Sequence, residues 1–284
     1  MQNFEKFSFS CQDGYPLSAR FYPSSAQQHR YPILIAPATG ITQGFYHAFA
    51  QWLNQQGYAV MVFDFRGIGE SLYEPLAQSK ASILDWGQLD LPAAVQALVL
   101  KTAAEQVILI GHSAGSQLLG VMPNHHQVAK LIAIAGSTGY VKGLKGRTRL
   151  LAPFMFKVVF PISCLVKGYG TTQAIGMGEN LPPNVAKQWA KFCSQPGYII
   201  NAQLQSEQDF HHEVRTPIQC IFASDDEIAT AQNVNDLIRL YPNAATQMLQ
   251  LDPKAHAQQK IGHMLMFKRS HQNLWPLIAQ HLAV

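Results

Sequence analysis

Short runs of consecutive apolar residues alternate along the chain with longer segments in which apolar residues recur every three or four positions. Such runs are typical of strands in a parallel sheet, where helices cover both faces. The periodic segments predict helices of about a dozen residues. Strands that alternate with helices indicate an α/β fold with right-handed crossovers. The strand-like runs are Ile33–Ala36, Ala59–Phe63, Val107–Ile110, Leu131–Ala135, Ile218–Ala223 and Met248–Leu251.

Two further segments near the N-terminus, Phe4–Ser10 and Leu17–Tyr22, partly alternate between polar and apolar residues. The turn residues Gln12-Asp13-Gly14 separate them, so together they predict an antiparallel hairpin at the edge of the sheet. With this hairpin we expect a mostly parallel sheet of about eight strands, with helices on both faces.

The alternation is interrupted between residues 137 and 197. Within this segment Leu150–Val166 is rich in Leu, Val, Phe and Met, but it contains Pro153, Lys157 and Pro161. A membrane-spanning helix needs about 20 apolar residues with few charges. We therefore expect a cap of short helices over a pocket, inserted at residues 137–197 into a core formed by residues 1–136 and 198–284. A transient contact with a membrane surface, made by this run and its basic flank Lys142–Arg149, is a second interpretation.

The most informative stretch is Gly111-His112-Ser113-Ala114-Gly115, which follows the run Val107–Ile110 without a polar break. Beyond it, Gly115, Leu118, Leu119 and Met122 share one face of a predicted helix. A serine on a sharp turn between a strand and a helix is the setting of the nucleophile elbow of hydrolases. The flanking glycines leave room for the chain to return against its strand.

A serine hydroxyl needs a base to take its proton and a group that orients that base. His263 follows the last predicted strand and precedes the C-terminal helix, so it is the candidate base. The orienting acid is expected in the loop after Ile218–Ala223, where Asp225 and Asp226 both stand. The chain order Ser, Asp, His is the order found in α/β-hydrolases.

On these residues the chain resembles an α/β-hydrolase over nearly its full length, on the branch of serine aminopeptidases, monoacylglycerol lipases and uncharacterised bacterial hydrolases. The resemblance implies Asp226, rather than Asp225, as the third member of a triad with Ser113 and His263. We interpret Arg66, within one of the similar motifs, as a structural residue that pins its loop. The similar motifs are Gly111–Gly115, Asp64–Ser71, Asp226-Glu227-Ile228 and Gly262-His263.

One motif departs from the pattern of the family. The oxyanion loop of the family usually begins with His-Gly, and the corresponding pair here is Pro37-Ala38. An oxyanion hole needs only backbone N–H groups. The resemblance implies that Thr39 and Ala114 supply them.

These candidate residues predict a serine hydrolase that works through an acyl-enzyme. The aromatic side chains Phe154, Phe156, Phe160 and Trp189 of the cap are the candidate substrate contacts, so we expect an apolar acyl or aryl carboxylic ester as substrate. The cap holds one carboxylate, Glu179, whereas an aminopeptidase should show acidic residues for the amine of its substrate. An amidase or aminopeptidase and an acyltransferase are alternatives on the same triad, and a non-catalytic binding module is disfavoured.

Composition and motif searches bear on the remaining questions of partner, cofactor and location. The net charge of +4 is mildly basic, and Lys and Arg cluster only around Lys142–Arg149, so no nucleic-acid partner is expected. Neither metal-ligand spacing nor a phosphate-binding glycine loop is present, so we expect no metal and no cofactor. The N-terminus lacks the pattern of a signal peptide, so the cytoplasm is the expected location. The oligomeric state has no signature in the sequence.

Overall fold

The computed structural model describes residues 4–24 and 31–283 of the 284-residue chain. Its centre is an eight-stranded sheet in the order β1-β2-β4-β3-β5-β6-β7-β8. The predicted α/β-hydrolase fold is confirmed, since six of these strands run parallel as a block from β4 to β8. The strands are β1 (Glu5–Ser10), β2 (Pro16–Tyr22), β3 (Ile33–Ala36), β4 (Val60–Phe63), β5 (Val107–His112), β6 (Val128–Ile134), β7 (Ile218–Ala223) and β8 (Thr246–Leu251).

The predicted hairpin forms one edge of this sheet. Strands β1 and β2 pair antiparallel, with Glu5 opposite Phe21 and Ser10 opposite Pro16, and β2 then pairs antiparallel with β4. At the centre every residue of β3, β4 and β5 is buried. This explains why the central strands read as uninterrupted apolar runs.

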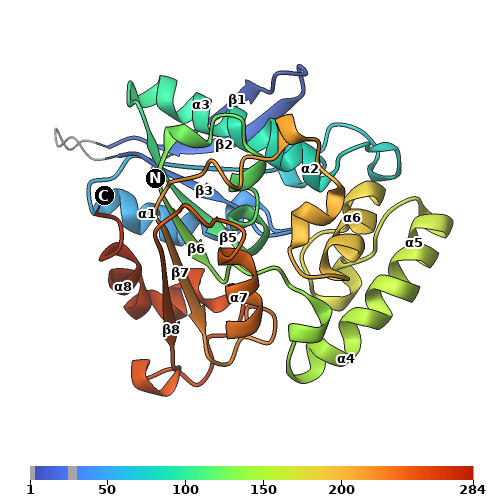
Figure 1. The fold of residues 1–284 in the computed structure, drawn as a ribbon. Helices are drawn as coiled ribbons and strands as arrows, with labels where there is room; N and C mark the ends of the chain where they lie inside the picture. Colours follow the sequence, from blue (N-terminus) through green and yellow to red (C-terminus); the bar gives the residue numbers. More distant parts are fainter. Residues whose placement is uncertain (1–3, 25–30, 284) are drawn as a thin grey trace.

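The helices cover both faces of the sheet because the strand order reverses at its centre. The chain passes from β3 to β4 on one side and then from β4 back across β3 to β5, so right-handed crossovers place α1 and α3 on opposite faces (Figure 1). Helix α8 lies with α1, where the Trp52 and Trp275 rings are 5.7 Å apart. The helices are α1 (His47–Gln55), α2 (Ile83–Asp85), α3 (Leu91–Thr102), α4 (Gly146–Phe154), α5 (Phe160–Lys167), α6 (Pro183–Cys193), α7 (Ala231–Ile238) and α8 (Trp275–Ala279).

The segment after the elbow differs from the prediction. Instead of an α-helix it forms two 3₁₀ turns, Ser113–Ser116 and Leu119–Val121. The physical reason lies in Gly120 and Pro123. Glycine disfavours the interior of a helix, and proline disfavours the α conformation of the residue before it, Met122, which is extended here. The apolar side chains of Leu118 and Leu119 are nevertheless buried, as an inward-facing stripe requires.

The segment between residues 137 and 197 forms a separate helical layer beside the carboxyl ends of the parallel strands (Figure 1). Short helices were expected here, with the run interrupted at Pro153 and Pro161, and this detail is wrong. The structure has one continuous helix, Gly146–Lys167, here called the cap helix. Pro153 lies inside α4 without ending the helix. A π-helical stretch, Met155–Val159, then joins α4 to α5 and places Pro161 in the first turn of α5, where proline is tolerated.

Candidate active site

The candidate nucleophile elbow is the turn that directly follows β5, a central strand of the sheet. Ser113 follows β5 directly and has a φ of 48°, a left-handed conformation that is strained for a residue with a side chain. A Cβ on Gly111 would stand 2.5 Å from the Cα of Ser116, and one on Gly115 would overlap the carbonyl of Ala36. Both glycines are therefore needed for the chain to return against β5 and β3.

The structure brings together the three side chains that the sequence places in distant loops. The Oγ of Ser113 lies 3.0 Å from Nε2 of His263, and Nδ1 of His263 lies 2.8 Å from Oδ2 of Asp226. The Asp226 side chain is fully buried, whereas that of His263 is 15 % exposed. A carboxylate that accepts from Nδ1 leaves Nε2 free to take the serine proton.

Hydrogen bonds keep Asp226 ionised at the end of β7. Its other oxygen, Oδ1, accepts from the backbone N–H groups of Ile228 at 2.7 Å and Ala229 at 2.9 Å. Burial opposes ionisation, but the facing His263 and these N–H donors outweigh it and lower the pKa of Asp226. The carboxyl group is therefore an anion that orients the imidazole.

The neighbouring Asp225 has a different position. Its carboxylate accepts from the N–H groups of Ile261 at 3.0 Å and Gly262 at 2.9 Å, which belong to the loop that carries His263. Asp225 thus ties the base loop to β7, whereas Asp226 contacts the imidazole itself. This geometry agrees with the choice of Asp226 that the family resemblance implied.

The loop after β3 lies next to the elbow, because Ala36 pairs with Gly111 across the two strands. Within this loop the N–H of Ala38 donates to the hydroxyl of Tyr46 at 2.9 Å. The next N–H, that of Thr39, has no acceptor among the described backbone and side-chain groups. Thr39 and Ala114 are thus placed at adjacent strand ends, as a two-donor oxyanion hole would require.

A buried hydrogen-bond chain connects both sides of the site through His112, a link that no sequence pattern reveals. Tyr46 Oη lies 2.8 Å from Nδ1 of His112, and Nε2 of His112 lies 3.0 Å from the backbone carbonyl of His263. Because the carbonyl can only accept, Nε2 carries the proton, and the Tyr46 hydroxyl donates to Nδ1. Burial and the adjacent His263 lower the pKa of His112 to about 3, so this imidazole stays neutral.

The loop Asp64–Ser71 is a structural clamp. Asp64 accepts from the N–H groups of Gln43 at 2.6 Å and Glu70 at 2.9 Å. The interpretation of Arg66 as the residue that pins this loop is confirmed, since it bonds Asp90 at 2.5 Å and Asp13 at 2.7 Å. The loop thereby holds the segment leading into α1 close to the end of β4.

Two glutamates connect the cap to the core beside the candidate triad. The N–H of Glu179 donates to the carbonyl of Gly40 in the oxyanion loop, and its carboxylate accepts from the N–H of Gly69, each at 2.8 Å. Glu227, the residue after Asp226, accepts from the N–H and hydroxyl of Thr148 at the start of the cap helix. Both sides of the site therefore contact the cap.

The four aromatic residues of the predicted substrate contact separate into two groups. Phe156, Phe160 and Trp189 pack on one another, with ring centroids 5.6 to 5.9 Å apart, between the cap helix and α6. Phe154 is 57 % exposed on the outer side of the cap helix, so its side chain does not line an enclosed pocket. Substrate contact by Phe156, Phe160 and Trp189 stays a prediction, whereas substrate contact by Phe154 lacks support.

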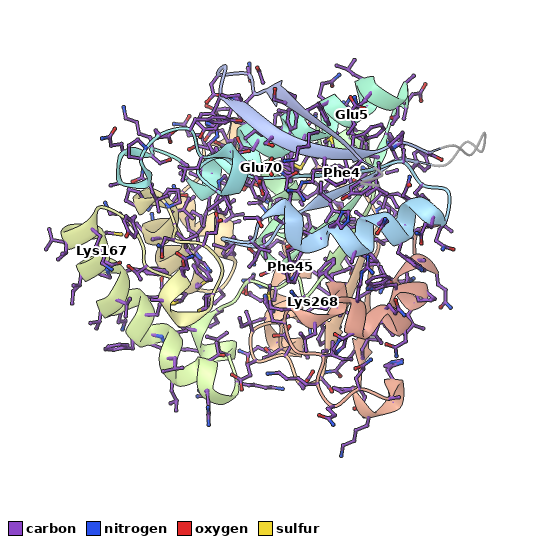
Figure 2. The ribbon with its side chains drawn as sticks, turned by 180° about the vertical axis from the view of Figure 1, so that it is seen from behind. Phe4, Glu5, Phe45, Glu70, Lys167 and Lys268 are labelled. Carbon is purple, nitrogen blue, oxygen red and sulfur yellow. The ribbon has the colours of Figure 1, made fainter. Side chains whose placement is uncertain are left out.

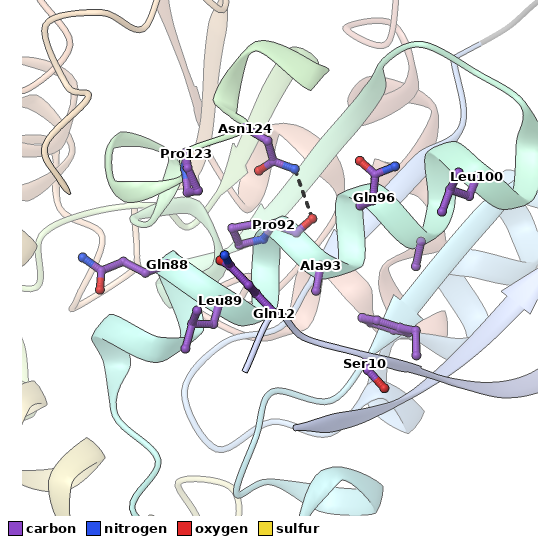
Figure 3. Close-up of a pocket in the computed structure, with 12 residues that line it drawn as sticks. Ser10, Gln12, Gln88, Leu89, Pro92, Ala93, Gln96, Leu100, Pro123 and Asn124 are labelled. Atoms are coloured by element: carbon purple, nitrogen blue, oxygen red, sulfur yellow. Dashed lines mark hydrogen bonds between the residues drawn. The ribbon is translucent and has the colours of Figure 1, made fainter. Parts of the chain in front are cut away.

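A groove of about 490 Å³ lies between α3 and the end of β1 (Figure 3). Ser10, Gln88, Gln96 and Asn124 supply polar atoms, and Asn124 donates to the carbonyl of Pro92 at 3.1 Å. No titratable side chain lines it, so it lacks the groups that acid–base chemistry needs. Within residues 4–24 and 31–283 no cluster of three or more His, Cys, Asp or Glu side chains is placed to hold a metal ion.

A family model described as serine aminopeptidase S33 matches residues 27–172, just over half of the chain. The chain belongs to this family. As a member it is an enzyme with the α/β-hydrolase fold. The matched part includes the oxyanion loop and the elbow with Ser113, whereas Asp226 and His263 lie beyond it, so their placement beside Ser113 rests on the geometry above.

Solved structures share this fold at low sequence identity. A soluble variant of monoglyceride lipase from Saccharomyces cerevisiae superposes with a TM-score of 0.65 at 14% identity, covering 100% of this chain and 96% of its own. The esterase Pf2001 from Pyrococcus furiosus gives 0.62 at 14% identity, with 98% and 88% covered. DcsB, solved with a substrate analogue, gives 0.64 at 14% identity and 98% of both chains. No curated protein sequence matches the chain.

Proposed function

We propose that this hydrolase cleaves carboxylic esters with an apolar acyl or aryl group through a covalent acyl-enzyme on Ser113. The observation that carries the proposal is the continuous hydrogen-bonded chain from Ser113 through His263 to Asp226, at 3.0 and 2.8 Å. Without a base within this distance a serine hydroxyl is a poor nucleophile. The strained elbow adds support, because it presents Oγ at the end of the sheet.

The reaction follows in two halves. In the first, Ser113 Oγ bonds to the ester carbonyl carbon while its proton passes to Nε2 of His263. The carbonyl oxygen becomes an oxyanion that accepts from the N–H groups of Thr39 and Ala114. His263 then protonates the leaving alkoxide, so the alcohol departs and an acyl-serine remains. In the second half, water gives a proton to His263 and attacks the acyl-serine, and the carboxylic acid leaves as Ser113 recovers its proton.

Two observations support an ester rather than a peptide substrate. The cap carries no carboxylate from residue 137 to residue 178, and the carboxylate of Glu179 already accepts from the N–H of Gly69 at 2.8 Å. This bond uses one of the two oxygens of Glu179, the one carboxylate that the cap could offer to a substrate ammonium. The esterase and the monoglyceride lipase among the similar structures agree with ester chemistry.

The test is a panel of p-nitrophenyl esters from acetate to dodecanoate beside p-nitroanilides of single amino acids. We expect a higher kcat/KM for the esters than for every anilide, and a loss of at least about 10³-fold in kcat with Ser113→Ala. Faster cleavage of an anilide would replace the proposal with an aminopeptidase. Adding an alcohol such as glycerol distinguishes an acyltransferase from a hydrolase, since an acyltransferase would form a new ester in place of the free acid.

A further inference from the structure

The outer face of the cap helix, Gly146–Lys167, is an exposed apolar surface. Twelve large apolar side chains of the described residues are exposed, and seven of them lie on this one helix, between 37 and 86 % exposed. Isolated exposed apolar residues are ordinary, but a contiguous patch indicates an interaction site. The seven residues are Leu150, Leu151, Phe154, Val158, Ile162, Leu165 and Val166.

The opposite face of the cap helix packs against the rest of the protein. Ala152, Met155, Phe160 and Ser163 are buried, and Phe160 packs against Trp189 of α6. By length and composition the helix could cross a membrane, with a mean hydropathy of 1.7 over its most apolar window. Crossing would require it to give up the buried contacts, whereas lying along a surface would use only the face that is already free.

The charged side chains of the segment that carries this face all have one sign, although Glu227 of the core contacts its first turn at Thr148. From residue 137 to residue 178 the chain contains six cationic side chains and no carboxylate, against a net charge of +4 for the entire chain. All six are exposed, and Lys167 projects at the far end of the helix (Figure 2). An apolar stripe bordered by cations complements a surface of acyl chains beneath anionic headgroups. The six are Lys142, Lys145, Arg147, Arg149, Lys157 and Lys167.

An open groove continues the apolar face toward α6. It has a volume of about 500 Å³, and its walls include Pro161, Leu165 and Lys187. Leu165 belongs both to this groove and to the exposed stripe, so the two form one surface. The groove offers apolar walls to an acyl chain, while Lys187 is placed for a headgroup.

We propose that the outer face of the cap helix docks the enzyme on anionic phospholipid surfaces, with the helix lying parallel to the membrane plane. The exposed leucines and the phenylalanine enter the boundary between headgroups and acyl chains, and the flanking lysines and arginines pair with phosphates. This docking is independent of the chemistry at Ser113, because lipid itself is the ligand.

Flotation of the full-length protein with lipid vesicles tests the proposal. We expect partition onto vesicles of phosphatidylcholine with 30 mol% phosphatidylglycerol, and weaker partition onto phosphatidylcholine alone or in high salt. Arg147→Gln with Arg149→Gln should lower partition about 30-fold, at roughly fivefold for each cation. Leu150→Ser with Leu165→Ser should lower it at least about tenfold, since these side chains lose apolar burial in the bilayer.

Matched controls separate docking from general surface effects. Arg215→Gln with Lys254→Gln removes two exposed cations outside the cap, and Leu100→Ser with Met248→Ser removes two exposed apolar side chains there. Both control pairs should partition like wild type. Equal partition of cap and control pairs would overturn the proposal, as would no preference for anionic vesicles. Sedimentation velocity of the protein without lipid gives a further test. A dimer that dissociates in the variant with Leu150→Ser and Leu165→Ser would also overturn the proposal, because a second copy would then cover the face.

Discussion

The backbone carbonyl of His263 accepts a hydrogen bond from Nε2 of His112, the residue immediately before the candidate nucleophile, at 3.0 Å. The same imidazole accepts from Tyr46, whose hydroxyl in turn accepts from the N–H of Ala38. One neutral, buried side chain thus sets the distance between the base loop and the oxyanion loop. We infer that His112 and Tyr46 position the two loops, since neither hydrogen-bonds the Ser113 hydroxyl or the His263 imidazole.

Removing the Tyr46 hydroxyl should therefore affect catalysis without affecting a substrate contact. In Tyr46→Phe, the N–H of Ala38 and Nδ1 of His112 lose their hydrogen-bond partners at buried positions. Each loss costs about 1–3 kcal/mol of folding stability. We expect kcat to fall about 10- to 100-fold with KM nearly unchanged. Steady-state kinetics at a temperature where both proteins are fully folded checks this. A rise in KM with unchanged kcat would show that Tyr46 contributes to substrate binding instead.

The low pKa of His112 predicts a pH dependence of stability. The folded pKa is about 3, below the ordinary value of 6.5, so between these values the unfolded chain binds a proton that the folded chain does not. Stability contributed by the neutral imidazole is therefore complete above pH 6.5 and is lost as the pH falls toward 3, at about 1.4 kcal/mol per pH unit. His112→Gln can keep both hydrogen bonds but does not titrate.

Urea unfolding at pH 7, 6, 5 and 4 measures this difference. As the pH falls, the free energy of unfolding of wild type should decrease more steeply than that of His112→Gln. The difference between the two slopes should correspond to the uptake of one proton on unfolding. Other buried histidines cancel in the comparison, because both proteins contain them. Parallel curves would show that His112 does not remain neutral in the folded state.

The two adjacent aspartates give a second pair of matched variants. Asp226→Asn keeps the size of the side chain but removes the anion that orients His263, so kcat should fall by about four orders of magnitude. Asp225→Asn keeps one acceptor for the loop N–H groups and leaves the triad intact, so the loss should be about 10-fold or less. Burst kinetics with a p-nitrophenyl ester compares the two. A larger loss with Asp225→Asn would exchange their roles.

The elbow can be tested through its close backbone contacts. A methyl group on Gly115 would overlap the carbonyl of Ala36, so Gly115→Ala should destabilise the fold by about 3 kcal/mol or more. Gly44→Ala is the matched control, because its Cβ would lie 3.5 Å from the nearest atom, Nη1 of Arg20. Thermal unfolding should show a clear loss for the first variant and little change for the second. Similar melting temperatures would contradict the tight turn.

The sequence predicts the sheet and the candidate triad because both depend on local patterns. Uninterrupted apolar runs mark the central strands, and Ser113 and His263 stand directly after strands or in the loops that follow them. Chains fold with the carboxyl ends of parallel strands along one edge, so polar residues at those positions meet.

The parts that could not be predicted depend on contacts between distant segments. Tyr46 and His112 are 66 residues apart, and no periodicity links them. The cap helix continues to Pro161 through a π-helical stretch, Met155–Val159, that no residue pattern in the sequence indicates.

The proposed role of Ser113 as the nucleophile can be tested by labelling the intact protein with a fluorophosphonate and locating the adduct by peptide mass spectrometry. We expect one adduct per chain, on the peptide that carries Ser113. Ser113→Ala should not react, and His263→Gln should react far more slowly, since the hydroxyl then lacks its base. Labelling of Ser113→Ala at the rate of wild type, or an adduct on another residue, would contradict this role.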